Sequence, residues 1–367
     1  MNLYEQLENL ENGIRNAKQI LSDNLNQKGV EVSVDDSLTY LADNVANIPQ
    51  GEGSGNGFDF SVIGYSKTLE NEINSVTNND IAYSKTKYDE WNPSNTSATS
   101  LYQGDTELVY APNIDMSNVK EMNQVFNGCT KLKVVPKYET SKVTSMINLF
   151  KSCSNLTEVP LFDTSNCTNF RAFFQNCINL KIVPTFNTSK ATEIGNMFDG
   201  CSNLTEVPLF DTSNCTNMGS MFYGCKSLTS IPKLDSRKSS SLSSFFYGCS
   251  SLKRIEELSL MSLSQTVSYS YFVGYSNNYS LRYILFKDIG YQERMKTFNN
   301  SYVNNWGVNS DEVPDARQSL IDSLITYSFD RAEAGYETCT ITLSSNSKAL
   351  LSEEEIAAIT AKGYTIA

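Results

Sequence analysis

The chain contains no histidine, and charged residues make up only 19% of its 367 residues. Without histidine it lacks the commonest general base, the usual partner in a catalytic triad and the commonest metal ligand. No apolar run approaches the roughly 18 residues that cross a bilayer, so we expect no membrane span. The formal net charge of −12 repels phosphate groups, so we also expect no nucleic-acid partner.

Two further signals are missing. The segment 1–6 has no basic start followed by an apolar stretch, so we expect no secretory signal there. The glycine-rich segment 51–57 lacks the Lys-Ser/Thr ending of a phosphate-binding loop. Without such a loop, nothing in the sequence indicates a cofactor, and we expect none.

A period of 24 residues runs through the centre of the chain. Each unit carries a phenylalanine, then a cysteine, a leucine and a valine or isoleucine at steps of three. The six cysteines of this column are Cys129, Cys153, Cys177, Cys201, Cys225 and Cys249. A second period of 48 is superposed, because segments 153–169 and 201–217 are identical and Asn alternates with Lys in the column from Asn118 to Lys238. Such periods predict a solenoid, in which stacking buries an apolar face that no unit buries alone.

The unit around Cys153 predicts a short helix followed by a short strand. Apolar residues at Met146, Leu149, Phe150 and Cys153 follow the spacing of one helix face. The segment 155–160 then reads as a brief strand that ends at a proline. We therefore predict an α/β repeat fold, a solenoid of helix-plus-short-strand units.

The repeats have degenerate units at both ends, as capping units do. Upstream, Tyr102, Gly104 and Leu108 keep the pattern, and Asp105 takes the place of cysteine. Downstream, 272–284 looks like a unit with stretched spacing. Near the end, Ser352–Glu355 predicts a capping box, a helix that stops at Gly363 and a closing strand at 364–366.

These features divide the chain into six parts. We assign 1–49 to a helical oligomerisation or attachment module, 50–57 to a Gly-rich linker and 58–100 to an N-terminal cap region. The regular repeats cover 101–258, irregular aromatic-rich repeats cover 259–310, and 311–367 forms a C-terminal cap.

The N-terminal module carries a heptad-like apolar stripe. Its spacing of four and three residues predicts a coiled-coil seam. The candidate seam residues are Leu3, Leu7, Leu10, Ile14 and Leu21. An amphipathic helix that packs on its own domain is the alternative. With the coiled coil we expect a homo-oligomer, with a trimer favoured.

The cysteines allow three interpretations: a buried reduced ladder, a set of disulfides, or a metal site. The buried ladder is favoured because the chain has no CxxC pair and no histidine. Cys167 and Cys215 replace Val119 and Val143 of the same column, which also points to packing.

The unit from Asp211 to Ile231, D-T-S-N-x-T-x-M-x-x-x-F-x-x-C-x-x-L-T-x-(V/I), resembles BspA-like leucine-rich repeats. Such repeats occur in bacterial surface proteins and in tail-fibre-like proteins of phages. The segment 26–48 resembles N-terminal modules of phage tail proteins, and 351–366 resembles the closing segment of phage-encoded members. The resemblance implies a leucine-rich-repeat solenoid in a non-enzymatic virion protein, assembled in the host cytoplasm, that recognises a host surface protein or glycan and joins other virion proteins through the N-terminal module. A bacterial cell-surface adhesin and a purely structural virion component are the alternatives.

Two surfaces are candidates for partner binding. The first is the strand face of the solenoid, with one variable residue per turn: Lys133, Thr157, Lys181, Thr205, Thr229 and Lys253. The second is the aromatic-rich segment 264–307, where Tyr271, Tyr275, Tyr279 and Trp306 stand among Ser and Asn. Exposed aromatic rings beside hydrogen-bonding groups suit carbohydrate or protein contact. The plainer alternatives are a solvated face and rings that fill an irregular core.

Paired carboxylates would be needed for glycan cleavage. Asp163 and Asp211 are available, but they recur in one column beside Thr and Ser, as a cap or turn demands. We therefore assign no catalytic residue and predict that the protein is not an enzyme.

Overall fold

The computed structural model describes residues 83, 87, 91–259, 281–287, 289, 297–299, 307–311 and 313–367. The predicted N-terminal seam lies outside the described residues, and so do Tyr271, Tyr275, Tyr279 and Trp306. Within the described part, no helix is long and apolar enough to cross a membrane.

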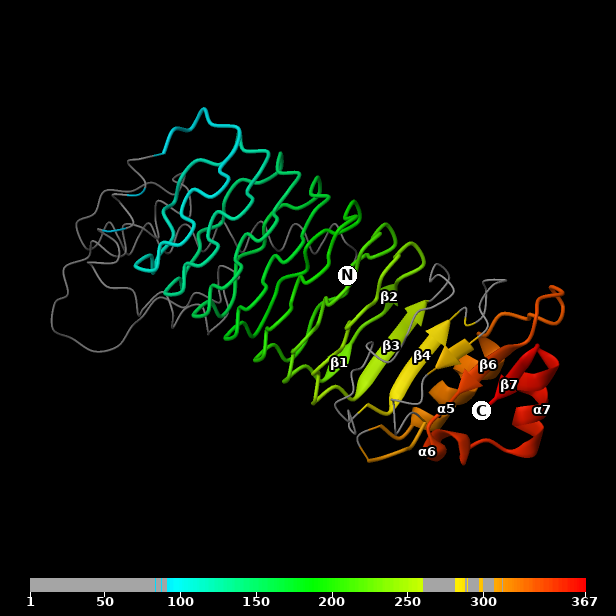
Figure 1. The fold of residues 1–367 in the computed structure, drawn as a ribbon. Helices are drawn as coiled ribbons and strands as arrows, with labels where there is room; N and C mark the ends of the chain where they lie inside the picture. Colours follow the sequence, from blue (N-terminus) through cyan, green and yellow to red (C-terminus); the bar gives the residue numbers. More distant parts are fainter. Residues whose placement is uncertain are drawn as a thin grey trace, which may run out of the picture.

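Residues 91–259 form a solenoid whose successive turns stack side by side (Figure 1). Backbone hydrogen bonds join neighbouring turns on two sides. On one side, the amide nitrogens of Met122 and Gln124 donate to the carbonyl oxygens of Ser145 and Ile147, at 2.9 and 2.8 Å. On the other, the amide of Lys133 donates to the carbonyl of Val109 at 2.9 Å. The predicted solenoid is thus confirmed for this part of the chain.

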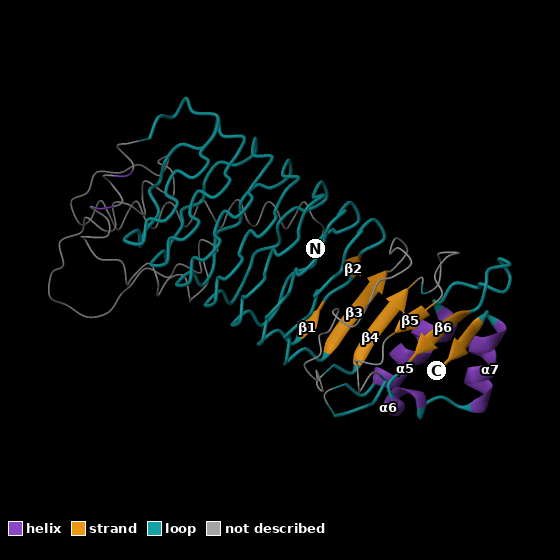
Figure 2. Ribbon diagram, in the orientation of Figure 1, coloured by secondary structure: helices purple, strands orange, loops and turns teal. Residues whose placement is uncertain are grey.

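The predicted helix in each unit is wrong. The residues expected to face the core, such as Met146 and Phe150, are buried. The backbone, however, runs through a series of tight turns, and Figure 2 shows no helix between residues 91 and 259. Turns joined by a backbone ladder lie about 4.8 Å apart, whereas an α-helix with its side chains is about 10 Å wide. A helix in each unit would therefore break the ladder on that side.

Left-handed residues make these turns possible. Two columns have positive φ in every unit, for example Asn148 (55°) and Ser152 (61°), or Ser220 (54°) and Gly224 (71°). The sequence places Gly, Asn, Ser, Gln or Ala there. Glycine and asparagine enter this region most easily.

The second half of each unit is extended, but it forms regular β-strands only toward the C-terminal end of the solenoid. They are β1 (Ser230–Ile231), β2 (Leu234–Asp235), β3 (Arg254–Ser259) and β4 (Tyr283–Lys287). All pair in parallel, with β3 between the strands of the preceding unit and β4. Ile255 pairs with Ile284 across this sheet, which confirms the stretched spacing of the downstream unit.

The C-terminal region closes the stack with a second parallel sheet. It consists of β5 (Thr297–Asn299), β6 (Cys339–Thr342) and β7 (Tyr364–Ile366). Its helices are α5 (Ala316–Ile321), which runs into a π-helical turn at Asp322–Thr326, α6 (Ser345–Lys348) and α7 (Glu353–Ala361). The predicted capping box is confirmed, because the Glu355 amide donates to Ser352 Oγ and the Ser352 amide donates to Glu355 Oε2.

Stacked aromatic rings fill the solenoid core. One ring per unit forms a continuous column: Tyr102, Phe126, Phe150, Phe174, Phe198, Phe222 and Phe246. Phe126 and Phe150 lie 5.5 Å apart with planes 2° from parallel. Because each ring is almost fully buried, the column contributes about 1.5–3 kcal/mol per residue through burial alone.

A glycine in the left-handed column provides the first test. We expect Gly224→Ala, with φ of 71° at this position, to lower the free energy of unfolding by about 1 kcal/mol. A Cβ there would meet nothing closer than 3.7 Å, so the cost comes from the backbone. Urea denaturation measures it. Gly219→Ala is the control, because Gly219 is not left-handed and a Cβ there would meet only side-chain hydroxyls closely, those of Ser241 and Ser243 at 3.2 and 3.4 Å. An equal loss in the control would contradict this explanation.

Candidate interaction surfaces

The cysteine column is buried, and its thiols hold the backbone. Each Sγ–H donates to a phenylalanine or tyrosine carbonyl in the preceding turn, as in Cys153 to Phe126 at 3.0 Å and Cys177 to Phe150 at 2.9 Å. The Phe126 oxygen also accepts from the Cys129 amide at 3.0 Å. Cysteine suits this position because it is small, apolar and a weak donor.

None of the nine cysteines is in a disulfide, and all are buried. This agrees with the predicted reduced ladder. Burial raises the thiol pKa to about 12 at Cys129, Cys167, Cys215 and Cys249. Such thiols stay protonated near neutral pH and are poor nucleophiles. Among the described residues, no cluster of acidic or cysteine side chains is placed to hold a metal ion.

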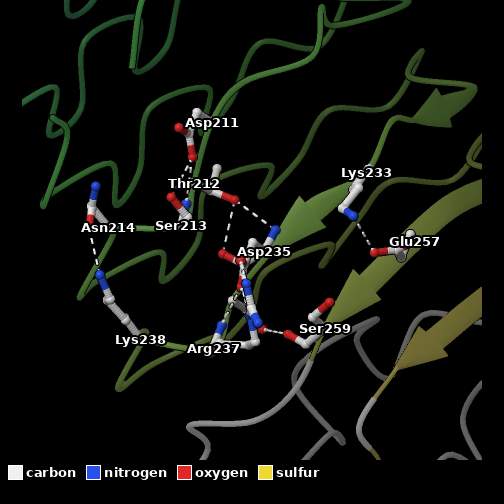
Figure 3. A network of polar contacts seen from close by, with 11 residues as sticks. Asp211, Thr212, Ser213, Asn214, Lys233, Asp235, Arg237, Lys238, Glu257 and Ser259 are labelled. Atoms are coloured by element: carbon white, nitrogen blue, oxygen red, sulfur yellow. Dashed lines mark hydrogen bonds and ion pairs between the residues drawn. The ribbon is translucent and has the colours of Figure 1, made fainter. Parts of the chain in front are cut away.

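The acidic column makes turns. The carboxylates of Asp163 and Asp211 accept from the amides of Ser165 and Ser213, each at 3.0 Å. The amide of Ser165 lowers the pKa of Asp163. In the next position, Thr212 Oγ1 donates to the Asp235 carbonyl of the following turn at 2.9 Å (Figure 3). These bonds support the turn interpretation of the acidic residues.

The period of 48 residues corresponds to a side-chain pair. Lys190 Nζ donates to Asn166 Oδ1 at 2.6 Å, and Lys238 Nζ donates to Asn214 Oδ1 at 2.6 Å (Figure 3). Asn166 Nδ2 in turn donates to the Ser141 carbonyl of the preceding turn at 2.8 Å. Each Asn–Lys pair spans two neighbouring turns of the solenoid, which explains why Asn and Lys alternate along this column.

The structure brings the six predicted strand-face residues into one column. The Lys181 amide donates to the Thr157 carbonyl at 2.9 Å, and the Lys253 amide donates to the Thr229 carbonyl at 2.8 Å. Lys181, Thr205 and Thr229 are exposed, and Lys133 and Lys253 are half-buried. Thr157 is buried, so it cannot contribute to a surface as predicted.

Four exposed aliphatic side chains lie on this half of three consecutive units, and the sequence analysis missed them. They are Leu161 (50% exposed), Ile178 (45%), Ile182 (43%) and Leu209 (59%). Ile182 occupies a column that holds Glu in both neighbouring units, and Ile178 one that holds Ser. These apolar residues in otherwise polar columns are the feature of the sequence that could have identified this surface. We call these four residues the aliphatic patch.

A polar groove lies on the opposite, turn-rich half of the units. It has a volume of about 480 Å³ and is lined by Glu193, Asn196, Thr216, Asn217, Gly219, Ser220, Ser240, Ser241 and Ser243. Tyr223, whose amide donates to the Ser220 carbonyl, stacks on Tyr247, with ring centroids 4.9 Å apart. Sequence reasoning did not identify this groove either.

Residues 96–182 and 153–259 match the family DUF285, described as a Mycoplasma protein of unknown function. A leucine-rich-repeat protein of T. pallidum is similar over 48% of this chain and 70% of its own, with 18% identity and a TM-score of 0.27. No curated protein matches the chain. The fold defines a solenoid repeat protein, and its repeats are similar to those of DUF285, in line with the predicted BspA-like resemblance. The TM-score is too low for the T. pallidum protein to inform the arrangement.

The buried thiols predict a pH dependence of stability. Burial raises the pKa of Cys167 and Cys215 from 9.0 to about 12, so the unfolded chain releases these protons first as the pH rises. The stabilisation is complete below about pH 9 and is lost toward about pH 12. We expect the urea midpoint to fall over this range.

The double variant Cys167→Val/Cys215→Val is the control. Valine is native to the same column at Val119 and Val143, so the fold should persist, and the fall with pH should be shallower. An equally steep fall in the double variant would show that these thiols do not cause it.

Proposed function

We propose that this chain is a non-enzymatic recognition protein whose strand face binds a partner on a host-cell surface. The aliphatic patch supports this proposal most directly. Single exposed apolar residues are ordinary, but clustered ones mark interaction surfaces. The exposed residue Lys181 precedes Ile182, and exposed Thr205 lies in the same unit as Leu209, so apolar contact and hydrogen-bonding groups occur together, as in protein–protein interfaces.

We further propose a phage virion as the setting, with the protein as part of a tail or fibre. The resemblance of segments 26–48 and 351–366 to phage-encoded proteins supports this. In this proposal the N-terminal module attaches the solenoid to other virion proteins. A bacterial surface adhesin would use the same face, whereas a purely structural virion component would not need the patch.

Binding without catalysis is supported by the use of the polar side chains. The acidic residues weighed as catalytic candidates, Asp163 and Asp211, accept bonds from their own turns. Cys153 and its equivalents are buried against carbonyl oxygens. Among the described residues, these aspartate and cysteine side chains therefore form hydrogen bonds with the backbone.

Leu209→Asp tests the strand face. Burial of one leucine is worth about 1.5–3 kcal/mol, so the variant should reduce binding at least about tenfold. Binding of fluorescently labelled full-length protein to a panel of Gram-positive and Gram-negative bacterial cells, measured by flow cytometry, gives the comparison.

Thr130→Asp is the matched control, because Thr130 is exposed, occupies the column of Ile178 two units earlier and gains the same single negative charge. It should bind like the wild type. Equal binding by both variants, or no binding of the wild-type protein to any strain, would contradict recognition through the patch.

Oligomerisation tests the proposed N-terminal module. We expect the full-length chain to be a trimer by native mass spectrometry, and Leu10→Asp to shift it toward monomer because a charge would enter an apolar seam. Asn9→Asp, beside the seam, adds the same charge and should leave the trimer intact. A wild-type monomer would exclude the coiled coil.

A further inference from the structure

The polar groove on the turn-rich half of the solenoid is separate from the strand face. We propose that it binds a neutral oligosaccharide, with the paired rings of Tyr223 and Tyr247 as a stacking platform. The proposal goes beyond partner binding at the aliphatic patch, since the groove shares no residue with that patch.

Two units lack a side chain at one outward column, and the second of the two glycines there, Gly219, lines the groove. The column holds Asn123, Ile147 and Arg171 in earlier units, and then Gly195 and Gly219. Neither glycine is left-handed, unlike Gly200 and Gly224, so the backbone does not require glycine there. Gly219 lines the groove, and a Cβ there would lie 3.2 and 3.4 Å from the hydroxyl oxygens of Ser241 and Ser243, which also line it. The glycines therefore provide room and not a turn.

The lining offers donors and acceptors in the mixture that sugar hydroxyls need. Glu193 Oε1 accepts from Thr216 Oγ1 at 3.2 Å, while Oε2 has no partner among the residues described. Asn196 and Asn217 contribute amide groups, and Ser241 and Ser243 contribute hydroxyls. A sugar hydroxyl both donates and accepts, and this set can satisfy both roles.

The tyrosine pair supplies the flat apolar face that a sugar ring stacks on. The two rings are within 5° of parallel, and Tyr223 is 39% exposed. The rings are close to the groove along the chain, because Tyr223 and Tyr247 follow the lining residues Ser220 and Ser243 by three and four positions and the Tyr223 amide donates to the Ser220 carbonyl at 3.2 Å. Earlier units hold Asn, Lys, Gln and Asp in the tyrosine column, so the platform is confined to the units beside the groove.

The charge of the site selects a neutral ligand. No lysine or arginine lines the groove, and Glu193 does. Together with the net charge of −12, this disfavours uronic acids, sulfated sugars and phosphates. The groove has a volume typical of ligand sites, but its lining is polar, which suits a saccharide better than an apolar peptide side chain.

Isothermal titration of the full-length chain tests the site. The probes are the neutral hexasaccharides of N-acetylglucosamine, β-1,4-glucose and α-1,4-glucose, with a hyaluronan hexasaccharide as the anionic comparison. We expect at least one neutral probe to bind, and hyaluronan to bind at least about tenfold more weakly. Gly219→Arg should abolish binding by filling the groove, and Tyr223→Ala should weaken it at least about tenfold.

The variants separate this site from the strand face. Arginine is native to the column at Arg171, and an unchanged urea midpoint confirms that Gly219→Arg is folded. Leu209→Asp should bind the saccharide like the wild type even where it loses cell binding. The proposal fails if none of the three neutral probes binds, or if folded Gly219→Arg binds as well as the wild type. Neither result would affect recognition through the aliphatic patch.

Discussion

Neighbouring turns of the solenoid share backbone hydrogen bonds on two sides, and this requirement shapes everything else in the repeats. The Met122 amide reaches the Ser145 carbonyl on one side, while the Lys133 amide reaches Val109 on the other. Because both ladders have the same spacing, about 4.8 Å per turn, each unit must be flat. A flat unit has no room for a helix, and so the chain reverses direction through left-handed turns at Asn148 and Ser152 and their equivalents.

The same ladder explains why chemically similar residues recur in columns. A carbonyl oxygen has two lone pairs, and a side chain from the adjacent turn often occupies the second. Cys153 Sγ does this at Phe126, and Thr144 Oγ1 does it at Lys120, where the Thr144 amide also donates. These short side chains reach only the neighbouring turn, so the same kind of donor recurs in most units of a column. The cysteines and threonines are thus part of the backbone network.

The sequence could predict the repeat, the buried columns and the C-terminal cap, because these depend on periodicity and on local capping chemistry. Leu149 and Phe150 are buried as expected, and Ser352 caps α7. The helix prediction failed because burial at Met146, Leu149, Phe150 and Cys153 fits either a helix face or a chain of turns. The distinction depends on where the amides bond, which for Phe150 is Phe173 in the next unit. No local pattern encodes that bond.

The outward columns follow a different rule, and this is why the candidate sites were harder to predict. An inward residue must match its neighbours above and below, whereas an outward residue only has to stay clear of the ladder. A residue that differs from the rest of its column is therefore informative about binding when it faces outward, and not when it faces the core. Ile182 between two glutamates, and Gly219 where Ile and Arg stand earlier, change nothing in the stack. Each alters what the surface offers to a partner, one by adding an apolar side chain and the other by opening a groove. Because the two departures lie on opposite halves of the units, the solenoid can present two chemically different surfaces while the core remains the same.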